Sequence, residues 1–66
     1  MGQLYDLRTK IEAKIAADRL DATDVKGKIG LKSGRLLAFI SPSTPDDPVA
    51  FEKLKQAAKD VLHLNI

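Results

Sequence analysis

The sequence predicts a small α+β domain, in which two amphipathic helices flank a central β-hairpin in the order α-β-β-α. Apolar residues recur at helical spacing over about residues 3–20 and again over about residues 47–63. Between them, residues 25–31 alternate in polarity, and residues 35–41 hold an apolar run of strand length. The chain has 66 residues and no cysteine, so we expect a single domain over residues 1–66 with a small core.

The first helix is predicted by one continuous apolar stripe. Its four members are spaced by three, four and four residues: Leu4, Leu7, Ile11 and Ile15. Asp18 would lie near this stripe if the helix continued. We therefore expect the helix to fray or end between Ala17 and Asp21.

The second helix has a clear start signal in the stretch DDPVAF. Asp47 can cap the first backbone amides, and Pro48 falls at the first helical position, where its missing N–H costs nothing. The stripe that should pack against the first helix consists of Phe51, Leu54, Ala58 and Val61. His63 lies in the last turn, where we expect a surface residue at the negative end of the helix dipole rather than a catalytic group.

The middle of the chain, VKGKIGLKSGRLLAFI, favours a hairpin. Its three glycines would each cost about 1 kcal/mol inside a helix relative to alanine, which argues against one continuous helix. One face of the first strand would hold Val25, Gly27, Ile29 and Leu31. Gly34 is free to take the positive φ that a turn needs, and residues 36–40 then return as a largely buried strand.

The alternative is an all-α fold with a helix-turn-helix at residues 23–40. Thr23 would cap a short helix, Gly30 would make the turn, and Ser33 would cap a second helix. The core of this alternative would include Val25, Ile29, Leu31, Leu36 and Phe39. The stretch IGLKSGRLL resembles the turn and the start of the recognition helix in many bacterial repressors, although Lys26 stands where that pattern normally has alanine.

Charge is distributed unevenly along the chain. There are 11 lysine and arginine residues against 9 acidic residues, a net charge of +2 that by itself implies neither nucleic-acid nor membrane binding. Four cations between Val25 and Ser41 have no acidic residue among them: Lys26, Lys28, Lys32 and Arg35. These four are the candidate nucleic-acid-binding residues; the competing interpretation is the solvated side of a half-buried strand.

The inventory of chemically reactive groups is thin. There is no cysteine nucleophile, His63 has no partner at a recognisable spacing, and the glycines form no phosphate-binding loop. The sequence therefore predicts no enzyme, no catalytic residues, no cofactor and no metal site.

Two non-enzymatic functions follow. The first is an interaction module that self-associates or binds a protein partner, because a lone hairpin leaves exposed edges that a second copy would pair. The second is weak nucleic-acid binding through residues 26–35, as a basic hairpin or a helix-turn-helix. No segment approaches the ~20 apolar residues that span a bilayer, so no membrane association is expected, and the cysteine-free composition favours the cytoplasm.

Overall fold

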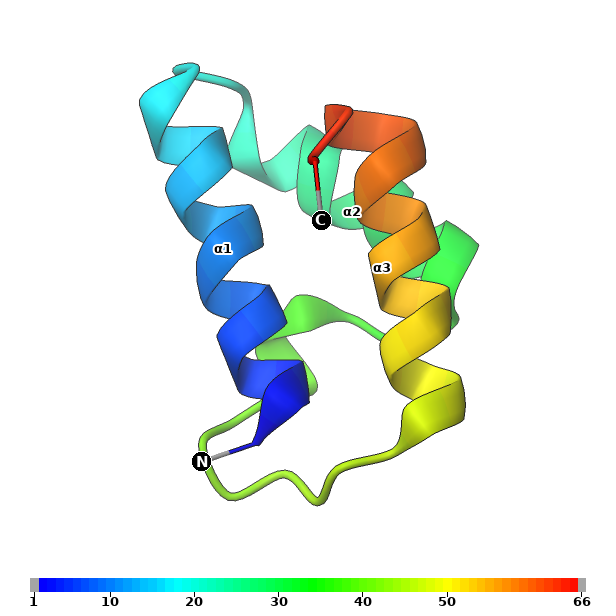
Figure 1. The fold of residues 1–66 in the computed structure, drawn as a ribbon. Helices are drawn as coiled ribbons and strands as arrows, with labels where there is room; N and C mark the ends of the chain where they lie inside the picture. Colours follow the sequence, from blue (N-terminus) through cyan, green and yellow to red (C-terminus); the bar gives the residue numbers. More distant parts are fainter. Residues whose placement is uncertain (1, 66) are drawn as a thin grey trace.

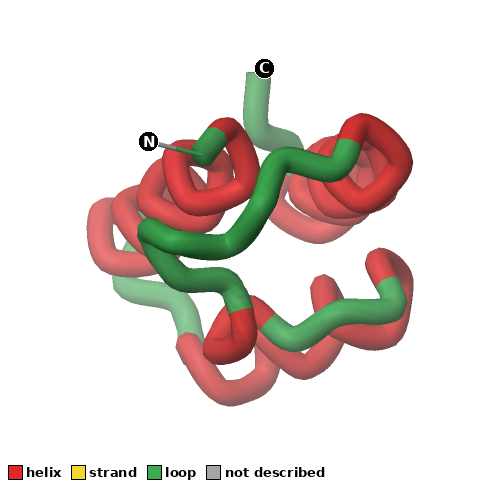
Figure 2. Tube along the Cα trace, turned by 90° about the horizontal axis from the view of Figure 1, so that it is seen from below, coloured by secondary structure: helices red, strands yellow, loops and turns green. Residues whose placement is uncertain are grey.

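A computed structural model describes residues 2–65, and these residues form helices in two layers (Figures 1 and 2). Helices α1 (Gln3–Ala17) and α3 (Pro48–Leu62) lie side by side in one layer and run in the same direction. Helix α2 (Ala22–Ser33) crosses beneath them with a short 3₁₀ helix, η1 (Leu37–Phe39), in the second layer. The described part of the chain contains no β-strand.

The core lies where the two layers meet. α2 packs against both α3 and α1, so no pair of helices buries the core alone. The core residues, each less than a tenth exposed, are Leu4, Leu7, Ile11, Ile15, Val25, Ile29, Leu37, Ile40, Leu54, Ala57, Ala58 and Leu62.

Helix α1 follows the prediction closely. All four residues of its predicted stripe are buried, and the helix ends at Ala17, within the predicted range. Asp18 closes the helix through its backbone N–H, and Arg19 then takes a left-handed conformation with φ of 54°. The chain thereby turns toward α2.

Helix α3 also begins as predicted. The Asp47 carboxylate accepts hydrogen bonds from the N–H groups of Val49 (3.0 Å) and Ala50 (3.3 Å), and Pro48 occupies the first turn. Leu54 and Ala58 of the predicted stripe are buried, whereas Phe51 and Val61 are half-buried. His63 is the exposed residue that ends α3, with φ of 56°.

The predicted hairpin is wrong. Residues 25–31, predicted as its first strand, belong to α2, which begins with a hydrogen bond from the Asp24 N–H to the Asp21 carboxylate (3.3 Å). Val25, Ile29 and Ser33 recur every four residues and are all buried. Burial of this helical stripe outweighs the low helix propensity of the glycines.

The second predicted strand, residues 35–41, is instead an extended segment that contains η1. Leu37 and Ile40 are buried, whereas Leu36 and Phe39 are exposed. A spacing of three residues between buried positions is typical of a 3₁₀ turn, in which residues i and i+3 share a side. The apolar run is therefore not buried as a strand would be.

The all-α alternative agrees with the structure in fold class but not in its details. α2 continues through Gly30, the predicted turn, and ends at Ser33, the predicted cap of a second helix. The break falls at Gly34, which takes φ of 76° and donates its N–H to the Gly30 carbonyl at 2.8 Å. Positive φ is easy for glycine and strained for other residues.

The loop before α3 passes beneath the N-terminal ends of α1 and α3 (Figure 1). Asp46 accepts a hydrogen bond from the Gln3 N–H at 2.8 Å, while the next residue, Asp47, caps α3. The Arg8 guanidinium donates to the Ile40 carbonyl, which also ties the loop to α1. Two adjacent acids thus satisfy the free amides at the starts of two helices.

Among residues 2–65, no helix combines the length and the apolar character needed to cross a bilayer.

The two glycines inside α2 provide a test of this helix. A Cβ at Gly27 would meet nothing within 4 Å, so Gly27→Ala should raise the free energy of unfolding by about 0.5–1 kcal/mol through helix propensity alone. A Cβ at Gly30 would lie 2.7 Å from Leu36 Cδ2, so Gly30→Ala should gain less because Leu36 must move. Urea unfolding at low protein concentration measures both. A loss of stability for Gly27→Ala, or a larger gain for Gly30→Ala than for Gly27→Ala, would contradict α2.

Candidate interaction surface

The side of α2 that points away from α1 and α3 is not covered by any other described segment (Figure 2). Helical periodicity places Asp24, Gly27, Lys28 and Leu31 there, whereas Lys32 lies at its border toward α3. Two exposed residues at η1, which contacts α2, complete this surface. We call the following seven residues the outer face: Asp24, Gly27, Lys28, Leu31, Lys32, Leu36 and Phe39.

The outer face has an apolar centre and one apolar edge. Leu31 is 88% exposed, the most exposed of the large apolar residues described. Phe39 is 74% exposed, and Leu36, 47% exposed, lies against Gly30 at the edge of the helix. Leu31, Leu36 and Phe39 are not accommodated in the core, so they are available to a partner.

The opposite edge of the outer face is charged. Asp24, Lys28 and Lys32 are four residues apart and form one stripe. Lys28 Nζ lies 3.1 Å from the Asp24 carboxylate, and Lys32 Nζ lies 4.0 Å from the Asp60 carboxylate of α3. All these side chains are at least half exposed, so the two ion pairs contribute little to stability.

The structure brings only part of the predicted nucleic-acid site together. Lys28 and Lys32 lie on the outer face, each near a carboxylate. Lys26 is half-buried on another side of α2, in a surface hollow that Glu12 of α1 also lines. Arg35 is exposed beyond the end of α2, where its backbone N–H donates to Ser33 Oγ at 3.4 Å. The four cations therefore do not form one uninterrupted basic surface.

The sequence interpretation missed the exposure of Leu31. Both the hairpin and the helix-turn-helix placed this residue with Val25 and Ile29 on an inward face. In one continuous helix, Leu31 follows Ile29 by two residues and therefore points away from the buried stripe. The signal that identifies it is the spacing of four between Val25, Ile29 and Ser33, which leaves Leu31 outside.

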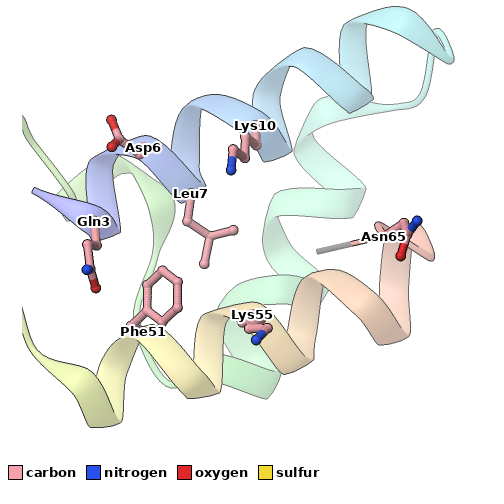
Figure 3. Close-up of a pocket in the computed structure, with 7 residues that line it drawn as sticks. All are labelled: Gln3, Asp6, Leu7, Lys10, Phe51, Lys55 and Asn65. Atoms are coloured by element: carbon pink, nitrogen blue, oxygen red, sulfur yellow. The ribbon is translucent and has the colours of Figure 1, made fainter.

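A second hollow, of about 430 Å³, lies between α1 and α3 (Figure 3). The side chains of Leu7 and Phe51 point toward each other across it. Lys10 of α1 and Lys55 of α3 also line it. Asp6 lies at the end of the hollow where α1 begins. The hollow combines an apolar wall with two ammonium groups.

No metal centre is evident in the part of the chain that the structure describes. No three histidine, cysteine or acidic side chains of residues 2–65 come together as a metal site. His63, the one histidine, is exposed at the end of α3. The outer face thus remains the surface with the most distinctive chemistry.

Comparison with known proteins adds no functional assignment. No protein-family model matches the chain, and no curated protein or solved structure matches it either.

Proposed function

We propose that the chain is a non-enzymatic interaction module that self-associates through the outer face. The observation that supports this proposal is the exposure of three large apolar side chains, Leu31, Leu36 and Phe39, on α2 and on the segment that packs beside it, in a domain of only 66 residues. Clustered apolar side chains rimmed by charges are typical of protein–protein contact sites. Covering them with a second copy would enlarge a core that is small for a stable domain.

The reason for self-association differs from the one that the sequence indicated. Pairing of hairpin edges no longer applies, because the described residues form no strand. The exposed side of α2 takes the place of those edges as the surface that needs covering. A cytoplasmic location remains a prediction from the cysteine-free composition.

Replacing Leu31 with lysine should prevent self-association without unfolding the domain. Because Leu31 is 88% exposed in the monomer, Leu31→Lys costs little in the fold but puts an unpaired charge into the contact. We expect the dissociation constant of the dimer to rise about tenfold or more. Sedimentation equilibrium over a range up to hundreds of micromolar measures it.

Ala13→Lys is the matched control, because Ala13 is an exposed apolar residue of α1, away from the outer face. It should leave the dissociation constant unchanged. A wild-type chain that sediments as a monomer throughout, or equal effects of the two lysine substitutions, would remove the proposed function. Far-ultraviolet circular dichroism shows whether each variant keeps its helices.

Nucleic-acid binding is the second candidate. The all-helical fold agrees better with this candidate than with a hairpin-mediated dimer, because a helix that carries exposed Lys28 and Lys32 is narrow enough for the major groove of DNA. Asp24 weakens the case for nucleic-acid binding. Its carboxylate lies 3.1 Å from Lys28 Nζ and would repel a phosphate group that approached Lys28. Any affinity through this face should therefore be weak and independent of base sequence.

Substitution of Asp24 tests this second candidate. Asp24→Asn should strengthen binding to a labelled DNA duplex at low salt, because it frees Lys28 and removes a repulsion. The Lys28→Ala, Lys32→Ala double variant should reduce the slope of log affinity against log salt by about 1.8. The control is the Lys10→Ala, Lys55→Ala double variant on the hollow between α1 and α3. Equal slopes for the two double variants would exclude the outer face as a nucleic-acid site.

A further inference from the structure

We infer that two copies pair through their outer faces with the two α2 helices antiparallel, across a two-fold axis near Lys28. This inference rests on the proposed self-association and gives the geometry and the contacts of that interface. The partner that it names is a second copy of this chain. Its basis is the order in which apolar and charged residues follow one another around and along α2.

Three parallel stripes make up the outer face. Gly30, against which Leu36 lies, marks the apolar edge. Gly27 and Leu31, one turn apart, form the central stripe. The charged edge consists of Asp24, Lys28 and Lys32. The apolar and charged edges thus lie on opposite sides of Leu31.

The order of these stripes favours an antiparallel pair. A two-fold axis that reverses one helix relative to the other places like edges together, so that Leu36 and Phe39 of both copies meet. A parallel pair would place the apolar edge of each copy against the charged edge of the other. Lysines would then lie over Leu36 and Phe39, and the apolar side chains would lose part of their burial.

The charges along the stripe favour the same arrangement. The acid, Asp24, lies toward the start of α2, and Lys32 lies two turns later. Reversal of one helix brings Asp24 of each copy opposite Lys32 of the other, which makes two complementary pairs. Lys28 faces its own counterpart at the axis, where the Asp24 carboxylate of the same copy lies 3.1 Å away and compensates its charge.

The central stripe provides room for close contact. A Cβ at Gly27 would meet nothing of its own chain within 4 Å, so the helix surface there is open. In the antiparallel arrangement, Leu31 of each copy leans over Gly27 of the other. The most exposed large apolar residue is thereby covered at the point where the two helices approach most closely.

Cross-linking at the axis tests this geometry. The chain has no cysteine, so a single Lys28→Cys variant reports only contacts between copies. Lys10→Cys is the matched control, since Lys10 is an exposed lysine in the hollow between α1 and α3. At concentrations where the wild type is dimeric, a short bismaleimide should join most of the Lys28→Cys chains in pairs and leave most of the Lys10→Cys chains single.

The possible results separate this geometry from self-association itself. A sedimenting dimer that does not cross-link through position 28, or that cross-links equally through position 10, overturns the antiparallel pairing and leaves the proposed function standing. A chain that stays monomeric in sedimentation overturns both. Circular dichroism of each cysteine variant establishes that the helices are present.

A double-mutant cycle on the dimer dissociation constant gives an independent readout of the same interface. Asp24→Asn and Lys32→Gln should each raise the dissociation constant of the dimer. The dissociation constant of the double variant should be lower, by about threefold or more, than the value obtained by multiplying the two single increases. Within one chain, these residues lie two helical turns apart and do not contact each other. Effects that simply multiply would contradict the predicted contact between Asp24 and Lys32 of different copies.

Discussion

The packing of α2 across α1 and α3 is the interaction on which the rest of the structure depends. Val25 and Ile29 are buried, and full burial of such a side chain stabilises by about 1.5–3 kcal/mol. Gly27 and Gly30 each oppose the helix by about 1 kcal/mol relative to alanine. Burial therefore exceeds the cost of the glycines, and a segment with weak helix propensity forms a helix because it has a surface to pack on.

This packing also determines what the molecule presents to others. When Val25, Ile29 and Ser33 face the core, Leu31 has to face solvent, and Lys28 and Lys32 lie to one side of it. Gly34 then turns the chain back, so that Leu36 and Phe39 lie beside the same helix. Both proposed functions use the surface that results, and they differ in whether its apolar centre or its lysines make the contact.

The two outer helices were predictable because each carries one unambiguous stripe and α3 has a cap at Asp47. The middle segment was not, because Val25 and Ile29 fit a period of two and a period of four equally well. The residues that follow distinguish the two periods. Leu31 is exposed and so does not fit a period of two, whereas Ser33 is buried and continues the period of four. The buried Ser33 hydroxyl donates to the Arg35 carbonyl at 3.0 Å. A polar residue inside the core gives no hydrophobic signal, so a search for apolar periodicity alone does not find the outer face.

The most direct test of this account is the set of backbone ¹³Cα chemical shifts for residues 22–40. One continuous α2 predicts helical shifts from Ala22 to Ser33, without interruption at Gly27 or Gly30, followed by a change at Gly34. Extended shifts over residues 25–31 and 36–40, with cross-strand contacts between them, would contradict the account. They would restore the hairpin and remove the outer face, the surface to which both proposed functions are assigned.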